Sequence, residues 1–199
     1  MRRKKEMETT QKMGNESMVT TLHVVARGLQ PFMVDAFRGQ GETPPEQKLY
    51  VGRNGSTLIL PGANIIGFLA SQSSISCLRQ FTDSKSWKVM FAEIIGSVSV
   101  SPPEIPFLDG EGKEISFDGF NEKVYLDERM ARPSSTARDL IRRPVIALPW
   151  ELRFDVNVFE APDGKVKASM ISDWIITGGF RVGIGAFRPL FGRFEAEIA

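Results

Sequence analysis

The sequence predicts a single α+β domain of the ferredoxin-like type, in which the core elements follow the order βαββαβ and a long insertion separates the second and third strands. Three observations predict this class. A chain of 199 residues suits one domain. Its composition, 42% hydrophobic and 25% charged, is that of an ordinary globular protein. Segments with strand-like and helix-like spacing of apolar residues then alternate along the chain in the required order.

The N-terminal part of the chain predicts a tail, a strand and a loop. Residues 1–17 are basic and then polar without periodicity, so we expect a flexible basic tail before a domain that spans 18–199. Residues 20–28 are rich in β-branched side chains and end at a glycine, which predicts the first strand. A loop with several glycines and prolines follows, and it contains short apolar stretches at 49–51 and 58–60.

The next segment predicts a helix and a second strand. Apolar residues recur at three- and four-residue spacing over 63–81, which indicates a helix with Gly67 inside it. Glycine lowers helix propensity by about 1 kcal/mol, so its presence points to close packing or to the close approach of a ligand. Residues 91–100 predict the second strand, which ends before Pro102 and Pro103.

The insertion covers about 101–147 and is polar, irregular and rich in arginine. Structureless loops of this length are uncommon inside compact domains, so we expect it to contain a hairpin or arm. Its arginines, Arg142 and Arg143 in particular, could follow a phosphate backbone beside aromatic residues that stack on bases. The alternative is a solvated loop, because nearby acidic residues offset the positive charge.

The C-terminal part predicts a strand, a helix, a glycine-rich turn and a last strand. Residues 150–159 alternate apolar and polar side chains, as a strand with one buried face does. Residues 167–176 have the spacing of a short helix, and 191–198 predict the final strand. The turn over 178–185 lies between them.

The glycine-rich turn is the strongest candidate binding feature. Gly178, Gly179, Gly183 and Gly185 fall within eight residues, with Arg181 among them and Arg188 shortly after. Glycine permits positive φ and exposes backbone N–H groups to a phosphate, and arginine supplies a charged fork for its oxygens. The alternative is a helix end followed by a tightly packed turn. Neither a Walker-type phosphate loop nor a dinucleotide-binding fingerprint fits, because the first motif is absent and this turn follows a helix.

Two segments together resemble the repeat-associated mysterious protein (RAMP) superfamily, whose members form backbone and processing subunits of CRISPR RNA-guided complexes. The stretch Leu60-Pro61-Gly62-Ala63-Asn64-Ile65-Ile66-Gly67 is similar to the family's apolar-Pro-Gly-Ser-Ser-apolar-Lys-Gly sequence at the start of its first helix, and the glycine-rich turn is the second segment. The resemblance implies a RAMP/RRM-like fold and RNA-backbone contacts at Gly62, Asn64, Gly67, Gly179, Arg181, Gly183 and Gly185. Where the family has a lysine and then an arginine in the helix, this chain has Ile66 and Ala70. The glycine-rich ending is also similar to uncharacterised bacteriophage proteins, which makes a phage-encoded relative an alternative.

Catalytic residues are not assigned. His23 is the only histidine, and we expect a structural residue in the first strand. Asp35 follows that strand, broadly where the resemblance places a target-cleaving aspartate in some backbone subunits, and we expect a solvated or capping loop acid. Histidine and cysteine together number two, His23 and Cys77, so no metal site or cofactor is predicted. His23 and Asp35 remain the candidates if the chain is an endoribonuclease.

The predicted function is a non-catalytic, single-stranded RNA-binding subunit of a CRISPR-type antiviral complex. Net charge is only +1, so the distribution of cations rather than their number carries this prediction. The partners expected are single-stranded RNA, with single-stranded DNA as the alternative, and either further copies of the chain or the other proteins of a ribonucleoprotein complex. The alternatives are an endoribonuclease of the same superfamily and a phage or mobile-element protein that binds single-stranded DNA or a protein. No apolar run is long enough to span a bilayer, so we expect a cytoplasmic protein without membrane contact.

Overall fold

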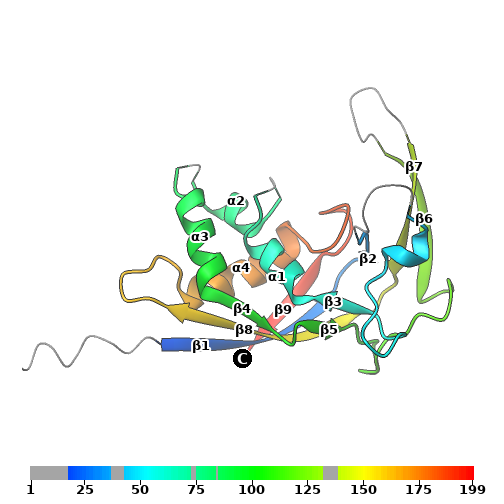
Figure 1. The fold of residues 1–199 in the computed structure, drawn as a ribbon, viewed down its shortest axis with the longest axis horizontal. Coiled ribbons are helices and arrows are strands. Elements are labelled where there is room, and N and C mark those ends of the chain that lie inside the picture. The colour runs from blue at the N-terminus through cyan, green and yellow to red at the C-terminus, as the bar shows by residue number, and fades with distance from the viewer. Residues whose placement is uncertain (1–17, 37–42, 73–74, 84, 132–138) are drawn as a thin grey trace, which may run out of the picture.

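The structure, a computed structural model, describes residues 18–36, 43–72, 75–83, 85–131 and 139–199. Its centre is a four-stranded antiparallel sheet with the order β4-β8-β1-β9 (Figure 1). The strands are β1 (Met18–Gly28), β4 (Val98–Ser101), β8 (Glu151–Glu160) and β9 (Phe194–Ile198). The longest pairing joins β1 to β8, from Met18 opposite Glu160 to Arg27 opposite Glu151. The strands predicted over 20–28, 150–159 and 191–198 are therefore present.

The helices lie on one face of this sheet (Figure 1). They are α1 (Gly62–Leu69), α2 (Cys77–Phe81), α3 (Trp87–Ser97) and α4 (Ala168–Arg181). The sheet turns its apolar side chains toward them, because successive strand residues point to opposite faces. In β8, for example, Leu152 and Phe154 are buried while Arg153 between them is exposed. The predicted mixed α+β class, with helices segregated from an antiparallel sheet, is confirmed.

Two smaller sheets lie beside the central one. Strand β2 (Phe32–Met33) pairs with β7 (Asp139–Ile146), which forms a hairpin with β6 (Val124–Ala131). Strand β3 (Ile59–Pro61) pairs with β5 (Glu104–Pro106), and a single 3-10 turn, η1, spans Pro45–Lys48. The β6–β7 hairpin extends away from the rest of the molecule as an arm (Figure 1). It lies inside the segment that we expected to be an insertion.

The helix predicted over 63–81 is wrong as a continuous element. Helix α1 ends at Leu69 because Ala70 adopts an extended backbone, with φ −139° and ψ 94°. A new helix starts at Cys77, where the Ser76 hydroxyl accepts a hydrogen bond from the backbone N–H of Arg79 at 3.4 Å. The apolar spacing persists across the break, since both helices pack on the same core, so periodicity alone does not detect it.

The strand predicted over 91–100 is mostly helix. Residues 87–97 form α3, in which Met90 and Ile94 are buried one turn apart, and only Val98–Ser101 is a strand. A short apolar run fits either element, and here its length up to Ser97 favours the helix. The short strand expected at 49–51 is reduced to a single bridge between Val51 and Leu58.

The glycine-rich turn is also shorter than predicted. Gly178 and Gly179 lie inside α4, which extends to Arg181, and the turn begins at Gly183, where φ is +71°. Both helical glycines are buried because α4 packs closely on its neighbours: a Cβ on Gly178 would overlap Cys77 Sγ, and one on Gly179 would lie 2.6 Å from the Phe194 carbonyl oxygen. Their role is helix packing, so the placement of Gly179 in an exposed turn was wrong.

Candidate nucleic-acid interface

A pocket of about 360 Å³ opens between α1 and the loop that follows α4. Its walls come from three parts of the chain that are distant in sequence: the segment around β2, helix α1 and the glycine-rich loop. The lining residues with polar groups or exposed backbone are Asp35, Tyr50, Asn64, Gly67, Ser71, Gly185 and Arg188. The two segments that carry the family resemblance therefore meet at one site.

The α1 wall is positioned by packing on its far side. Ile65 and Phe68 are buried in the core, which turns Asn64 and Gly67 toward the pocket. The N–H of Gly62 donates to the Pro103 carbonyl at 2.8 Å, and this contact fixes the start of the helix. A Cβ on Gly67 would meet nothing within 4 Å, so packing does not require glycine there. Because Gly67 has no side chain, the helix backbone at this position is accessible to a ligand in the pocket.

The loop wall is held to the β2 segment by main-chain hydrogen bonds. The N–H of Ala186 donates to the Met33 carbonyl, and that of Gly192 donates to the Pro31 carbonyl, both at 2.9 Å. Gly185 has φ +91°, and a Cβ there would lie 2.7 Å from the Met33 carbonyl oxygen. Glycine is therefore needed at 185 for close approach to β2, independently of any ligand. The loop is a rigid wall rather than a loose turn.

Arg188 supplies positive charge to the pocket. Its side chain is partly buried, and burial lowers the pKa of the guanidinium from its ordinary value. Within the described part of the chain, Arg188 makes no hydrogen bond or ion pair with another residue. A buried cation without a counter-charge is costly, and an anionic ligand would remove that cost. The pocket therefore presents a positive charge that no described residue neutralises.

Asp35 also lines the pocket, but its charge is compensated. Arg143 Nε lies 2.7 Å from Asp35 Oδ2, and Lys48 Nζ lies 3.9 Å from Asp35 Oδ1. Lys48 also donates to the Arg142 carbonyl at 2.9 Å. These contacts join the pocket wall to strand β7 of the hairpin. The net electrostatic character of the pocket is thus set by Arg188.

The other predicted contact residues lie outside the lining. Arg142 is exposed on the hairpin and pairs with Glu128 at 2.8 Å. Arg181 ends α4 with its guanidinium 5.4 Å from the centroid of the Phe81 ring. Gly62, Gly179 and Gly183 are buried beneath the surface. Of the predicted residues, the structure brings Asn64, Gly67, Gly185, Arg188 and Asp35 together at the pocket.

Tyr50 and Ser71 line the pocket but were not predicted. Ser71 follows the extended Ala70 just beyond the end of α1, so its place in the lining does not follow from helical spacing. Tyr50 lies in a loop, and its approach depends on tertiary packing that local patterns do not encode. Ala186 comes from the glycine-rich loop itself and faces the pocket beside Arg188.

His23 lies far from this pocket in the fold, on the open face of the central sheet. Its Nδ1 is 2.7 Å from Asp155 Oδ1, and both side chains line a shallow hollow of about 300 Å³. Strand pairing places Asp155 opposite both His23 and Ser101. Aspartate therefore stands between serine and histidine, whereas activation of a serine nucleophile requires histidine in the middle. The geometry matches a hydrogen-bonded pair on a sheet surface.

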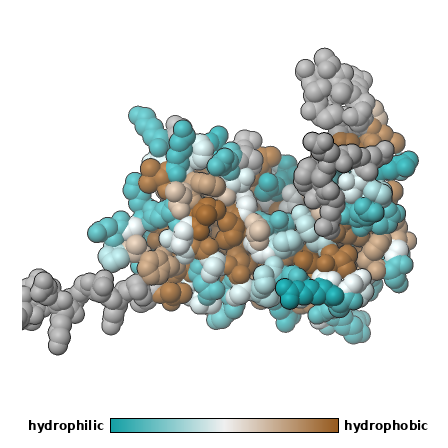
Figure 2. Space-filling view, in the orientation of Figure 1, coloured by the Kyte–Doolittle hydropathy of each residue, from teal (hydrophilic) through white to brown (hydrophobic). Residues whose placement is uncertain are grey.

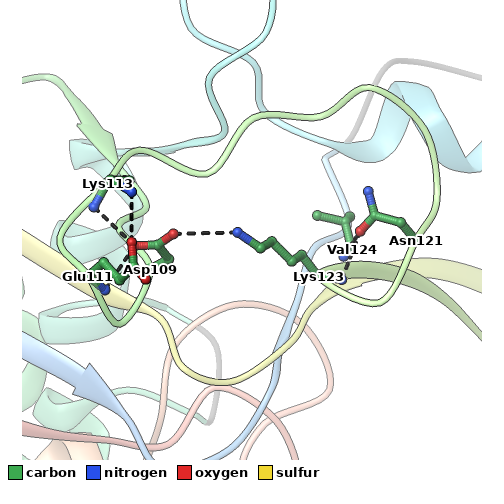
Figure 3. Close-up of polar contacts among 6 residues, drawn as sticks. All are labelled: Asp109, Glu111, Lys113, Asn121, Lys123 and Val124. Carbon is green, nitrogen blue, oxygen red and sulfur yellow. Dashed lines mark hydrogen bonds and ion pairs between the residues drawn. The ribbon is translucent and has the colours of Figure 1, made fainter.

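The base of the hairpin is fixed by a polar network (Figure 3). The Asp109 carboxylate accepts hydrogen bonds from the backbone N–H groups of Lys113 and Glu111, each at 3.0 Å, and faces Lys123 Nζ at 3.5 Å. The backbone N–H of Lys113, then that of Glu111, holds the pKa of Asp109 below its ordinary value. Asn121 Oδ1 accepts from the N–H groups of Lys123 and Val124, where β6 begins. The network anchors the arm to the β5 side of the molecule.

Comparisons with known proteins give a likeness in fold. No protein-family model matches the chain, and no curated protein matches its sequence. A chain in the cryo-EM structure of the Type III-B Cmr-beta complex bound to cognate target RNA superposes with a TM-score of 0.51 at 13% sequence identity. The match covers 98% of this chain and 64% of that subunit, so the present chain spans about two thirds of the subunit's length.

Within the described residues, no helix has the length and apolarity to cross a bilayer. Nor does the described part of the chain bring three or more His, Cys, Asp or Glu side chains together as metal ligands. The fold of the described residues is similar to that of a chain in the Type III-B Cmr-beta structure.

Proposed function

We propose that this protein is a non-catalytic subunit of a CRISPR-type ribonucleoprotein complex and that it holds the backbone of single-stranded RNA in the pocket between α1 and the glycine-rich loop. The observation that carries the proposal is Arg188, a partly buried cation that lines the pocket and has no counter-charge among the described residues. A phosphate is the anion that the resemblance and this geometry favour together.

The frame is that of a ferredoxin-like RAMP domain. In the split βαβ arrangement the first and third core strands occupy the middle of the sheet. Strands β1 and β8 have these positions, and β4 and β9 form the edges. The likeness to a Cmr-complex chain at a TM-score of 0.51 supports the same frame. We propose that α1 and α4 are its two core helices and that the 101–147 segment is an insertion within one domain.

Arg188 compensates for cations that the family has in its first helix. The corresponding side chains here, Ile66 and Ala70, pack against or within the hydrophobic core. Arg188 reaches the same space from the opposite wall. Asn64 and the open backbone at Gly67 complete a site that contacts phosphate and sugar without contacting base edges. Binding should therefore be independent of sequence and should weaken with salt.

Exposed apolar side chains are consistent with assembly into a larger complex. Met130 and Leu140 are cross-strand partners on the hairpin and are 62% and 53% exposed. Val89 and Ile95 are exposed on α3, and Figure 2 shows apolar side chains gathered over the helical side of the molecule. Apolar surface of this kind commonly marks a protein interface. We propose a second subunit, identical or different, as the partner of these surfaces.

An endoribonuclease is the second candidate, favoured by the carboxylate of Asp35 at the pocket wall. The ion pair with Arg143 holds that carboxylate away from the role of a free general base. Cleavage of labelled RNA by the wild type that disappears in Asp35→Asn or His23→Ala would establish this activity. A phage or mobile-element protein that binds single-stranded DNA, or a protein through the same scaffold, is the other alternative.

Fluorescence anisotropy with labelled single-stranded RNA, single-stranded DNA and duplex tests the proposal. We expect RNA binding that Arg188→Gln weakens by about 10- to 100-fold, because a charged hydrogen bond is worth about 1.5–3 kcal/mol. The salt dependence of log K should also become shallower by about 0.7 for one lost phosphate contact. Arg153→Gln, an exposed arginine on the open sheet face, is the matched control and should bind as the wild type does. Absence of wild-type binding at about 10 µM and low salt, where even non-specific binding is measurable, contradicts the proposal.

A further inference from the structure

Phe187 has a backbone conformation that phenylalanine rarely adopts. Its φ is +57°, and it is the one described residue other than glycine with positive φ. The left-handed conformation is costly for a bulky side chain, and such residues cluster at ligand-binding sites. The side chain gains little burial in return, because 44% of the residue is exposed. Packing in the core therefore does not account for a phenylalanine at this position.

The ring of Phe187 is nevertheless held in place. The Arg129 guanidinium from strand β6 lies 4.8 Å from the centroid of the Phe187 ring and 4.8 Å from that of Phe191. The two rings meet edge to face with centroids 6.4 Å apart. Arg129 is in turn fixed by a bidentate contact with Asp127. A fixed cation therefore lies over one face of the ring.

Phe187 lies next to the pocket in sequence, between Ala186 and Arg188, which both line it. Its own ring is outside the lining and lies against Arg129 of strand β6. A nucleotide chain that continues from Arg188 along the loop toward β6 would meet this ring. An oriented aromatic ring next to a phosphate-binding cation is the combination that proteins use for single-stranded nucleic acids.

We propose that the exposed face of Phe187 stacks on one base of the nucleotide chain whose backbone phosphate binds at Arg188. This inference rests on the proposed function and adds a base-binding position to a backbone-binding site. The ligand class is single-stranded nucleic acid, because both faces of a base inside a duplex are already covered by its neighbours. Every base has a π-face, so the contact selects unpaired bases without selecting their identity.

A stacking-sensitive probe tests the inference directly. We would use an RNA of about four nucleotides, short enough to limit the number of registers in which it binds, that carries one 2-aminopurine, moved along the chain position by position, and a matched series with one abasic site. With the wild-type protein, we expect quenching of 2-aminopurine at one position. The abasic substitution at that position should weaken binding by about 5- to 100-fold, the range measured for loss of one stacked base.

Three variants separate the ring from its surroundings. Phe187→Asn removes the ring but tolerates positive φ, and Phe187→Tyr keeps the ring. We expect Phe187→Asn to lose the position-specific quenching and to bind intact and abasic RNA equally, and Phe187→Tyr to behave as the wild type. Phe180→Ala is the control: Phe180 is 59% exposed beneath Arg193 on α4, away from the pocket lining, and its loss should leave the quenching unchanged.

The outcomes distinguish this inference from the function on which it rests. If the wild type binds RNA and depends on Arg188, but abasic substitution has no effect at any position, the stacking contact is wrong and the backbone site stands. Equal loss of quenching in Phe180→Ala and Phe187→Asn also overturns the specific assignment. If the wild type does not bind RNA at all, the proposed function fails first. The abasic series uses unmodified protein, so it decides the question even if Phe187→Asn does not fold.

Discussion

The guanidinium of Arg143 lies 2.7 Å from the carboxylate of Asp35, and this contact joins the hairpin arm to the wall of the pocket. The Arg143 side chain is largely buried, whereas the neighbouring Arg142 is exposed and pairs with Glu128 at the surface. The sequence predicts phosphate contact for both arginines, but in the structure the two have different roles. Arg143 neutralises a pocket carboxylate, and Arg142 remains accessible on the arm.

Arg143→Gln should weaken RNA binding by about 3- to 10-fold, because the Asp35 carboxylate would then repel phosphate with only Lys48 nearby. The free energy of unfolding should fall by about 1 kcal/mol. Adding Asp35→Asn should restore binding, since it removes the uncompensated charge. Anisotropy and urea denaturation measure the two effects. Arg142→Gln is the control for stability, with an expected change below about 0.5 kcal/mol, and failure of Asp35→Asn to rescue binding would contradict the electrostatic explanation.

Gly67→Ala should stabilise the protein while it weakens RNA binding. Alanine raises helix stability by about 0.5–1 kcal/mol over glycine, and the new methyl group meets no protein atom within 4 Å. The same methyl group would project into the pocket and hold a ligand away from the α1 backbone. Gly96→Ala is a matched control, because Gly96 lies in helix α3, is similarly free of contacts and lies outside the pocket lining. Thermal melting and anisotropy on both variants should show parallel stabilisation but loss of affinity only for Gly67→Ala.

Gly179→Ala should destabilise the protein by about 1–3 kcal/mol, as overpacking in a close-packed interior does. The added Cβ would lie 2.6 Å from the Phe194 carbonyl oxygen, so α4 must move away from β9. Urea denaturation followed by far-UV circular dichroism measures the change, and Gly96→Ala again provides a helical reference. A variant as stable as the wild type would argue that α4 and β9 are packed less closely than described here.

Asp109 should contribute to stability in a pH-dependent way. Backbone N–H groups lower its pKa in the folded protein, so the folded state favours the ionised carboxylate. The contribution is complete above the ordinary carboxyl pKa of about 3.9 and disappears as pH falls through the lower folded value. Asp109→Asn should lower the free energy of unfolding at neutral pH. As the pH falls, this difference between the variant and the wild type should shrink and disappear. A constant difference between the two curves down to about pH 2 would contradict this linkage.

The parts of the fold that sequence predicted are those encoded by local alternation. Residues 150–159 alternate almost strictly, and β8 (Glu151–Glu160) covers nearly the same residues, with Phe154 and Val156 buried toward the helices. The break between α1 and α2 was missed because it depends on a capping interaction of Ser76 and not on the apolar pattern. Gly178 and Gly179 were placed in the turn for a related reason. A glycine can be required by positive φ or by close packing, and the sequence alone does not distinguish the two.

The residues of the candidate site that were predicted are likewise those that belong to local sequence motifs. Gly67, Gly185 and Arg188 belong to two local motifs, and their convergence depends on how the helices and loops pack on the antiparallel sheet. The ion pair between Asp35 and Arg143 joins residues 108 positions apart, and no local pattern indicates it. The exposed ring of Phe187 was likewise invisible, because its positive φ arises from the path of the loop and not from its own residue type.

The attachment of the glycine-rich loop through backbone atoms has an evolutionary consequence. Ala186 and Gly192 bind the Met33 and Pro31 carbonyls with their own N–H groups, so these tethers would survive the replacement of almost any side chain around them. Lineages could then exchange the cations and rings that the loop presents while retaining its shape. Divergent homologues of this protein should therefore be easier to recognise by the spacing of the glycines at 183, 185 and 192 than by overall identity.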